Sequence, residues 1–469
     1  MLYQGRIDTR NLMVLGACVS AGCAVTEREV VMERPNIVLI MVDDMGYGDL
    51  GCFGHPKIKT PVLDQLAKDG IKLTDFYAGA TVCTPSRMAL LTGAYPPRVG
   101  WTRGVIGFKM GWGDGMNPEA LTIAEIFKSE GYATGICGKW HLGNQPDTRP
   151  HQQGFDVAYY IEKSNNQTKK IWNKDDVIVN KFDNRKLTEN FTREAVKFIK
   201  ANKDKPFFLY LPYSAPHFPV QAHPQWKGKS DFGEYGDVVE ELDFRIGKIR
   251  QLLREEKLEK KTIIVFFSDN GPNPNEKASP GPCRGEKWSA LEGGTRVPAM
   301  VTWPGVIPSG QESDALMAAI DLLPTLCHAC GIDWKKKSTG KPKIDGVNMW
   351  NTLLGKEEKN PRSELLYWHG MSSKPQAIRA GNWKLFFNRQ NALNGMGTAR
   401  KTPEQAAALE KLKKSGNDPV LFNLKDDIGE TVDLSEKHPD KVRELKARAE
   451  EIMADIKSST ILPVVKPKK

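Results

Sequence analysis

The stretch NIVLIMVDD, residues 36–44, decides the fold, because six consecutive apolar residues run directly into two carboxylates. Three later stretches repeat this pattern of an apolar, β-rich run with polar residues close behind it. They are residues 132–137, with Lys139 and His141 behind them; residues 207–211, with His217; and residues 262–267, with Asp269 and Asn270. Near-continuous apolar runs of this length predict strands that are buried on both faces.

Helical patterns separate these runs. Residues 62–70 begin after Pro61, which suits the first helical position, and stop at Gly70. Residues 121–131 and 236–255 also have the spacing of amphipathic helices. Strands that alternate with helices predict an α/β fold with a large, mostly parallel sheet sandwiched by helices. Ligands of such a sheet bind beyond the carboxyl ends of its strands, where the polar residues above all fall.

The pattern changes near residue 360. Residues 377–387 predict a hairpin that turns at Gly381-Asn382, and residues 421–424 predict a further strand. Apolar residues recur along one face of a helix over residues 439–457. The polar, lysine-rich segment 389–418 predicts a long surface loop. This part of the chain therefore predicts a smaller antiparallel sheet packed by a terminal helix.

These patterns divide the 469 residues into three parts, in line with about 150 residues for an average domain. A catalytic domain is expected over residues 34–360 and an α+β subdomain over residues 361–469. Residues 1–33 precede both and are expected to lie outside the fold.

The N-terminal segment predicts export. Arg6 and Arg10 precede an apolar stretch, residues 12–25, that is too short to span a bilayer and has the flanks of a secretory signal. Cys18 and Cys23 each follow small residues, as in a bacterial lipobox. Two outcomes stay open: a simple cleaved signal, or a chain anchored to the membrane by a lipid on Cys18 or Cys23. Both predict a periplasmic or extracellular protein.

The composition is that of a soluble globular protein with a basic excess. Hydrophobic residues make up 40% and charged residues 26%, which excludes a polytopic membrane protein and a wholly disordered chain. Lys plus Arg total 67 against 57 for Asp plus Glu, so the formal net charge is +10 at pH 7. This charge suits a polyanionic partner such as nucleic acid, acidic lipid or acidic polysaccharide. A solvated basic face explains it equally well.

Two clusters of cysteine or acidic residues suggest metal chemistry. The carboxylates of Asp43, Asp44 and Asp269 and the amide of Asn270 form an oxygen set, which favours Ca²⁺ or Mg²⁺ over zinc. Helix caps and turns are the alternative for each pair, and Gly46, Gly48 and Gly271 are expected to let the chain turn there. The CxxC stretch at residues 327–330 lacks a second CxxC, so buried packing on a helix is preferred for it.

A nucleophile beside a cation is predicted at Cys83-Thr84-Pro85-Ser86-Arg87. Pro85 places Cys83 at the start of a short helix, where the helix dipole favours anions and lowers a thiol pKa. Arg87 follows one turn later on the same face, as an oxyanion substrate requires. The alternative is a helix-start cysteine with a surface arginine.

The Cys-x-Pro-Ser-Arg stretch, followed by a short helix and Thr92-Gly93, resembles the signature of type I sulfatases in the alkaline-phosphatase superfamily. Five further blocks look like family blocks in family order, and together they carry far more weight than a lone motif. They are residues 35–48, 138–143, 215–217, 268–271 and 292–298. The resemblance runs from about Arg34 to the C-terminus and is nearest to the arylsulfatase and N-acetylgalactosamine-6-sulfatase branch.

This resemblance implies an alkaline-phosphatase-like fold and a modified nucleophile. A separate maturation enzyme would oxidise Cys83 to Cα-formylglycine, whose hydrate attacks sulfur and later expels sulfate. Ca²⁺ would be held by Asp43, Asp44, Asp269 and Asn270, with the modified Cys83 beside it; Mg²⁺ is the alternative. Arg87 and Lys139 would hold the hydrate, His141 would take a proton, and His217 and Lys287 would contact the sulfate and the leaving oxygen.

The resemblance further implies a sulfuric ester hydrolase, with a sulfated saccharide as the expected substrate. No nucleic-acid partner is expected, and membrane contact is expected only through a lipid anchor. The loop at residues 101–117 offers Trp101, Trp112 and Lys109 for sugar and anion contacts, or it is a glycine-rich surface loop. Two other functions stay open: a formylglycine-dependent phosphodiester or phosphonate monoester hydrolase, and a non-catalytic sulfated-glycan binder with unmodified Cys83.

Overall fold

The computed structural model describes residues 34–108, 115–356, 359–393, 403–413 and 419–462. The predicted signal segment with Cys18 and Cys23 lies outside the described residues, as do Lys109 and Trp112. None of the helices in the described part of the chain combines the length and the apolar character needed to cross a membrane.

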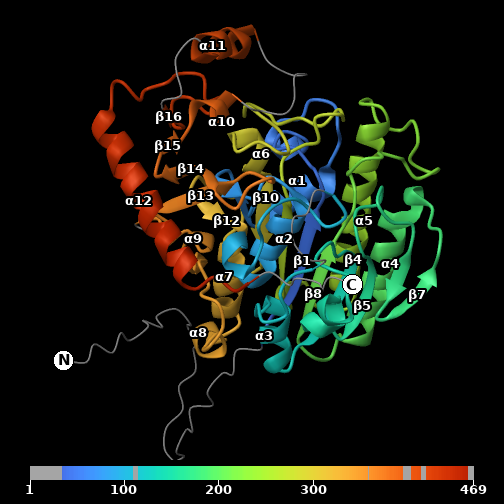
Figure 1. The fold of residues 1–469 in the computed structure, drawn as a ribbon. Helices are drawn as coiled ribbons and strands as arrows, with labels where there is room; N and C mark the ends of the chain where they lie inside the picture. Colours follow the sequence, from blue (N-terminus) through green and yellow to red (C-terminus); the bar gives the residue numbers. More distant parts are fainter. Residues whose placement is uncertain (1–33, 109–114, 357–358, 394–402, 414–418, 463–469) are drawn as a thin grey trace, which may run out of the picture. The chain divides into compact units, whose positions relative to one another are not determined.

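Four parallel strands form the centre of a ten-stranded sheet in the order β9-β1-β8-β4 (Figure 1). They are β1 (Asn36–Val42), β4 (Ala133–Lys139), β8 (Phe207–Pro212) and β9 (Thr262–Ser268). Every residue of the four strands is buried, as their apolar runs predicted. Val42 pairs with Ser268 and Met41 with Pro212, so β1, β8 and β9 end level with one another at the same edge.

Outer strands make the sheet mixed. On one side β5 (Val157–Ile161) is parallel to β4, and the antiparallel strands β6 (Ile171–Asn173) and β7 (Asp176–Val179) follow. On the other side the order is β10 (Ala299–Thr302), antiparallel to β9, then β2 (Ile71–Leu73) and β11 (Gln311–Ser313). A separate two-stranded sheet pairs β3 (Phe76–Tyr77) with β12 (Met317–Ala318).

Helices cover both faces, because alternate residues of each central strand enter opposite cores. Along β1, Ile37, Leu39 and Met41 belong to one core, and Val38, Ile40 and Val42 belong to the other. The first core contains side chains of α2 (Cys83–Thr92), α3 (Ile123–Ser129) and α7 (Leu322–Ala329). The second contains side chains of α1 (Pro61–Asp69), α4 (Leu187–Ala201) and α5 (Glu234–Glu255). The predicted α/β sandwich is confirmed.

The CxxC stretch belongs to the first core. Cys327 lies in α7 and Cys330 directly follows it, and both thiols are buried and free of disulfide bonds. The prediction of buried packing at this stretch is therefore confirmed. Three further α-helices in the described part of the chain have four residues each: α6 (Glu292–Thr295), α8 (Trp334–Lys337) and α9 (Trp350–Leu353).

The C-terminal part forms the predicted antiparallel sheet, with strands in sequence order. They are β13 (Glu364–Trp368), β14 (Pro375–Ala380), β15 (Trp383–Phe386) and β16 (Val420–Asn423). The β14–β15 hairpin turns at Gly381-Asn382, where Gly381 has a φ of +55°. Helix α12 (Pro439–Ser458) contacts β14 and β15 and buries Leu445, Ala449 and Ile456 (Figure 1).

The prediction of a loop over residues 389–418 is wrong for two segments. Residues Arg389–Leu393 form α10, whose Ala392 is buried in the first core, and residues Pro403–Lys413 form α11. The sequence of α11 explains the difference. Pro403 occupies the first helical position, and the alanine, glutamate, leucine and lysine residues that follow are strong helix formers. The polar composition of this segment therefore led to the prediction of a loop where α11 forms.

A buried ion cluster joins the small sheet to the large domain. The Nζ atom of Lys384, on β15, lies 2.8 Å from a carboxylate oxygen of Glu292 and 2.9 Å from one of Glu430. All three side chains are fully buried. Glu292 also accepts hydrogen bonds from Tyr77 and Tyr367. Because these residues come from α6, β15 and a loop near the C-terminus, the cluster ties three distant parts of the chain together.

Candidate active site

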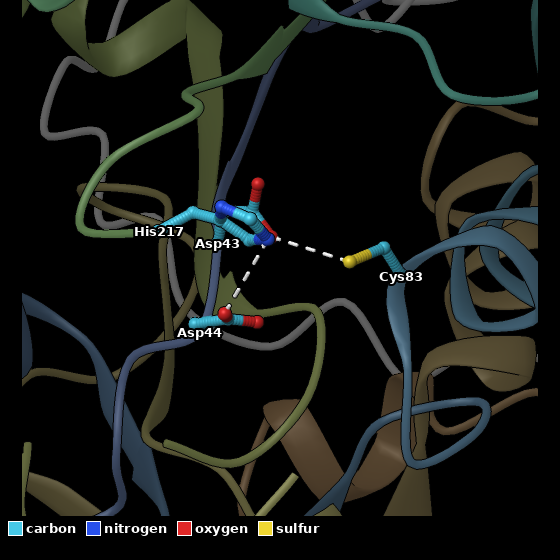
Figure 2. A group of neighbouring side chains, drawn as sticks. All are labelled: Asp43, Asp44, Cys83 and His217. Carbon is cyan, nitrogen blue, oxygen red and sulfur yellow. Dashed lines mark hydrogen bonds and ion pairs between the residues drawn. The ribbon is translucent and has the colours of Figure 1, made fainter. Parts of the chain in front are cut away.

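Polar side chains gather where the central strands end. Asp43 and Asp44 follow β1, His217 follows β8, and Cys83 is the first residue of α2. Figure 2 shows these four side chains turned toward one another; one potential ligand atom from each lies within 4.8 Å of those of the others. His217, predicted as a catalytic residue only, thus also lies within reach of a cation held by the aspartates.

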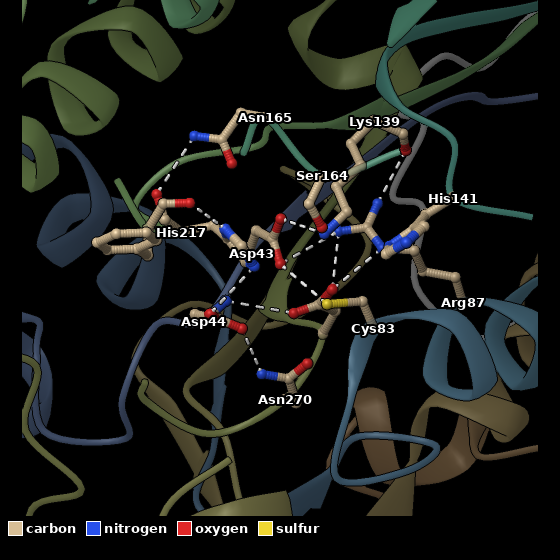
Figure 3. Close-up of polar contacts among 12 residues, drawn as sticks. Asp43, Asp44, Cys83, Arg87, Lys139, His141, Ser164, Asn165, His217 and Asn270 are labelled. Carbon is tan, nitrogen blue, oxygen red and sulfur yellow. Dashed lines mark hydrogen bonds and ion pairs between the residues drawn. The ribbon is translucent and has the colours of Figure 1, made fainter. Parts of the chain in front are cut away.

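The structure brings every predicted site residue to this one place, and Figure 3 labels all of them except Asp269 and Lys287. The side chains are at most 8% exposed. They are Asp43, Asp44, Cys83, Arg87, Lys139, His141, His217, Asp269, Asn270 and Lys287. They come from the ends of β1, β4, β8 and β9, from α2, and from the loop before α6. The strand-end pattern of the sequence thus located the site.

Both aspartates point into the site because the chain turns at Asp44 itself. Asp44 has a φ of +67°, and its backbone N–H donates to Asp269 over 3.3 Å. Gly46 and Gly271 serve a purpose other than the predicted one. A Cβ at Gly46 would lie 2.1 Å from the Ser279 carbonyl oxygen, and one at Gly271 would lie 1.9 Å from that of Gly293. These positions need glycine because the backbones approach closely, not because φ is positive.

Asp43 links the thiol to two cations. Its Oδ1 atom lies 3.5 Å from Cys83 Sγ and 3.8 Å from an Arg87 nitrogen, and its Oδ2 atom lies 2.6 Å from Lys139 Nζ. Arg87 donates two hydrogen bonds to Asp269, over 2.7 and 3.0 Å. The Arg87 side chain is fully buried, so it is not the surface arginine of the alternative interpretation. Its pairing with Asp269 lets the buried guanidinium keep its charge.

Asp44 contacts a lysine, an asparagine and a histidine of the site. Its carboxylate is 2.5 Å from Lys287 Nζ, 2.8 Å from the side-chain amide of Asn270 and 3.7 Å from His217 Nε2. Lys287 Nζ is also 3.4 Å from Cys83 Sγ. Asn273, which the sequence did not single out, donates to Asp44 over 3.4 Å. The side chains of Lys287 and His217 therefore flank the thiol from the side of Asp44.

The oxygen set suits a hard divalent cation. Three buried carboxylates converge here, and the Oδ1 atom of Asn270 has no hydrogen-bond partner among the described residues. An acceptor buried in this way is costly unless something coordinates it. With a divalent cation bound, the charges of Arg87, Lys139 and Lys287 would give the site a positive balance, as an anionic ester requires. Asp43, Asp44, Asp269 and Asn270 therefore fit such an ion.

The local field activates Cys83. Burial alone raises the pKa of the thiol, but the charges of Lys139 and Lys287 outweigh it and lower the pKa to about 6. This shift favours the thiolate form, in contrast to an ordinary buried cysteine. The other five cysteines of the described residues lie outside the site, and burial raises the pKa of each of them.

The pKa values of His217 and His141, the two histidines of the site, are shifted in opposite directions. Burial lowers the pKa of His217, but the carboxylates of Asp44 and Asp43 outweigh it and raise the pKa. Burial and the charge of Lys139 lower the pKa of His141 well below its usual value. His217 is therefore suited to donate a proton, and neutral His141 is suited to accept one.

A cavity of 760 Å³ opens above Cys83. Cys83, His141, His217 and Lys287 line its charged end. The aromatic rings that line it are Phe108, Phe218 and Trp288, none of which the sequence singled out, although two of them directly follow His217 and Lys287 in the chain. Trp101, expected as a sugar contact, is only 1% exposed and donates to the Gly104 carbonyl. It is a core residue, so that expectation is wrong.

Comparisons with known proteins show which family the chain belongs to. The sulfatase family model matches residues 35–332, and the model for the C-terminal region of aryl-sulfatase matches residues 360–463. Arylsulfatase A of Homo sapiens is 33% identical over 459 residues, which cover 90% of this chain and 87% of that protein. N-acetylgalactosamine-6-sulfatase of Mus musculus is 34% identical, with 92% and 87% covered.

A solved structure shares the whole fold. It comes from work on the metabolism of multiple glycosaminoglycans by Bacteroides thetaiotaomicron, and it superposes with a TM-score of 0.75 at 28% identity. The match covers 90% of this chain and 99% of that one. The predicted alkaline-phosphatase-like architecture and the predicted resemblance are thereby confirmed. The chain belongs to the sulfatase family of sulfate ester hydrolases, in the neighbourhood of the arylsulfatases and N-acetylgalactosamine-6-sulfatases.

Proposed function

We propose that this sulfatase releases inorganic sulfate from a sulfated saccharide and that Cys83, converted to Cα-formylglycine, carries the nucleophile. One observation carries the proposal: Cys83 lies at the charged end of the cavity, 3.5 Å from Asp43 and 3.4 Å from Lys287. The hydrated aldehyde supplies an oxygen nucleophile and a second hydroxyl through which sulfate is later expelled. A maturation enzyme for Cys83 is the implied partner.

The residues around Cys83 would balance charge, bind the sulfate group and transfer protons. Lys139 and Arg87 balance the charge of Asp43 and Asp269, so that an anionic group can stay beside residue 83. The ammonium group of Lys287 also lies beside residue 83, where it would bind the sulfate oxygens. His217 suits the role of the acid that protonates the leaving oxygen, and His141 that of the base that accepts a proton from residue 83.

Ca²⁺ is the proposed metal, with Mg²⁺ as the alternative. Asp43, Asp44, Asp269 and Asn270 would hold it, with residue 83 and His217 nearby. Bound there, the ion would polarise a sulfate oxygen as a Lewis acid.

A saccharide is favoured by the relatives and by the cavity. One relative is named an N-acetylgalactosamine-6-sulfatase, and the solved structure comes from work on glycosaminoglycans. Side chains of Asn166, Gln167, Asn273 and Asn275 line the cavity, and amides both donate to and accept from hydroxyl groups. We also propose export, because the sequence of residues 1–33 has the pattern of a secretory signal.

The decisive experiment measures sulfate release from a panel of defined monosulfated saccharides, with a phosphate diester and a phosphonate monoester assayed in parallel. We expect release from at least one saccharide and a much lower rate on both phosphorus esters. A preference for a phosphorus ester would contradict the proposal, and no release from any saccharide would refute the substrate class.

Asn270→Ala is expected to weaken Ca²⁺ binding. The variant loses one uncharged oxygen ligand, whereas the carboxylates remain. For the wild type, Ca²⁺ at 100 times its dissociation constant raises the free energy of unfolding by about 2.7 kcal/mol. We expect Asn270→Ala to need at least about tenfold more Ca²⁺ for the same shift in melting temperature.

Asn351→Ala, at an exposed residue outside the site, is the matched control and keeps the wild-type Ca²⁺ response. The same titration with Mg²⁺ separates the two cations. A wild-type melting temperature that is indifferent to both ions after chelation argues against a metal in this site.

His217→Asn is expected to slow substrates with poor leaving groups most. If His217 donates a proton to the leaving oxygen, its loss lowers kcat/KM about 100-fold for a saccharide sulfate. 4-Nitrophenyl sulfate, whose leaving oxyanion needs no proton, loses much less. His223→Asn is the control, because His223 is buried but faces Glu189. Equal losses on both substrates would instead assign His217 to sulfate or metal binding.

A further inference from the structure

Two phenyl rings stand exposed at the cavity. Phe108 and Phe218 each leave 46% of their surface exposed, and both line the cavity above Cys83. Leaving such a ring in water forgoes part of the roughly 1.5–3 kcal/mol that its full burial contributes. Two rings exposed in the same cavity therefore suggest a contact with something that enters it.

The turn that carries Phe108 is hydrogen-bonded to two residues at the site. Its backbone pairs with Val105 through two hydrogen bonds, which closes a tight turn. Within that turn, the Ile106 N–H donates to the hydroxyl of Thr84, the neighbour of Cys83, and the Ile106 carbonyl lies 2.8 Å from His141 Nε2. The backbone that carries the Phe108 ring is thus anchored beside residue 83.

Trp288 supports the Phe108 ring from the side. The two rings meet edge to face with centroids 6.1 Å apart. Trp288 is itself fixed, since its N–H donates to the Thr81 carbonyl and its ring packs against Gly370, where a Cβ would lie 2.6 Å away. An exposed ring with a rigid support loses little conformational freedom when a ligand covers it.

Phe218 is fixed relative to the proposed acid. It directly follows His217, and the His217 Nδ1 atom lies 2.6 Å from the Phe218 carbonyl oxygen. The His217 carbonyl in turn accepts from Asn165 over 3.4 Å. Phe108 and Phe218 therefore belong to two separate segments, each anchored to one of the two histidines of the site.

The cavity is lined by two kinds of residue. Among its described lining residues, the cationic or titratable groups are Cys83, His141, His217 and Lys287. The remainder combines the aromatic rings with neutral amides such as Asn166 and Gln167. A pyranose ring has apolar C–H faces that pack on aromatic rings and hydroxyl groups that bond to amides. An acyclic sulfate ester offers no such face.

We propose that Phe108 and Phe218 are specificity-determining residues that hold the pyranose ring of the substrate while its sulfate reaches residue 83. This inference rests on the proposed saccharide sulfatase function and assigns recognition of the ring to two particular side chains. The sulfate-binding residues treat all sulfate esters alike, so the preference for a cyclic saccharide over an acyclic ester comes from these rings.

The test compares two substrates with the same leaving chemistry. One is the saccharide sulfate of the panel that the wild type hydrolyses fastest; the other is an alkyl sulfate of the same alcohol class, propyl sulfate for a primary position and isopropyl sulfate for a secondary one. The measured quantity is the ratio of the two kcat/KM values. We expect Phe108→Ala and Phe218→Ala each to lower this ratio roughly five- to tenfold, through a higher KM for the saccharide.

Three controls make the result specific. Phe108→Tyr and Phe218→Tyr keep a ring and should restore the ratio to within twofold of the wild type, whereas a general folding defect would not be rescued in this way. Phe244→Ala removes a phenyl ring that is 39% exposed on α5 and should leave the ratio unchanged.

The outcomes separate this inference from the proposed function. If the wild type hydrolyses no saccharide sulfate, the proposed function fails first. If it does, and neither alanine variant lowers the ratio, or both substrates slow by the same factor, the assignment of ring recognition to Phe108 and Phe218 is overturned while the proposed function stands.

Discussion

Replacing Cys83 by alanine is expected to abolish sulfate release, with a loss of at least about 10⁴-fold in kcat. Under the proposed function the side chain of residue 83 carries the nucleophile, and neither Lys287 nor His217, which line the same cavity, would supply the hydrated aldehyde that the covalent step needs. The fold should persist, with the free energy of unfolding within about 2 kcal/mol of the wild type, because only one sulfur atom is removed.

Cys327→Ala is the matched control. Its thiol is equally buried but lies in α7 within the first core, so turnover should stay near the wild-type rate. Mass spectrometry of the tryptic peptide spanning residues 73–87 completes the test. Wild-type protein from its native host should show an aldehyde in place of the thiol. An intact thiol there would support the glycan-binding alternative, and turnover retained in Cys83→Ala would contradict the nucleophile assignment.

Lys384→Met is expected to cost about 3–5 kcal/mol of stability at neutral pH. The ammonium group lies within 2.9 Å of both Glu292 and Glu430, and all three side chains are fully buried. Methionine matches the length of the lysine stem but leaves two buried carboxylates facing each other without their shared cation. Chemical denaturation at pH 7.5 measures the difference.

The sign of the pH dependence follows from the same carboxylates. Burial raises the pKa of Glu292, but Lys384 and Arg296 outweigh it and lower the pKa to about 2, while burial raises the pKa of Glu430. Removing Lys384 takes away a charge that lowers both pKa values, so the pKa of each carboxyl rises and the carboxyls of the variant take up protons as pH falls. The difference in free energy of unfolding between Lys384→Met and the wild type should therefore become smaller as the pH falls from 7.5 to 5.5.

Lys343→Met provides the comparison for that variant. Lys343 pairs with Asp455 over 2.9 Å, but the two side chains are 57% and 44% exposed. Lys343→Met should therefore lower the free energy of unfolding by less than about 1 kcal/mol. A gap that widens at low pH, or a cost for Lys384→Met as small as for Lys343→Met, would show that the buried cluster contributes little.

The central strands and the location of the site could be predicted from local sequence. The runs that form β1, β4, β8 and β9 are each long and apolar enough to require burial on both faces. Parallel strands bring their carboxyl ends to one edge, so Asp43, Lys139 and Asp269 had to approach one another. The start of α2 at Cys83 followed from Pro85 for an equally local reason.

Other features depend on contacts that no local pattern records. Strands β2 and β11 have three residues each; β2 pairs with β10 and β11 pairs with β2, so both depend on a neighbour that is distant in sequence. Trp101 and Phe108 belong to the same glycine-rich stretch, yet one is a core residue and the other stands in the cavity, and only the tertiary structure separates them. The cluster around Lys384 joins residues up to 138 positions apart.

The complete burial of α2 has a consequence for how the enzyme is made. Every residue from Cys83 to Thr92 is buried, and Cys83 itself is 2% exposed. A modifying enzyme needs access to its target and to the neighbouring residues, and residues 81–92 are all buried in the folded protein. If Cys83 is converted as proposed, the conversion has to happen while the polypeptide is still being synthesised or translocated, so a host that lacks the modifying enzyme will accumulate well-folded, permanently inactive protein that no later treatment with that enzyme can mature.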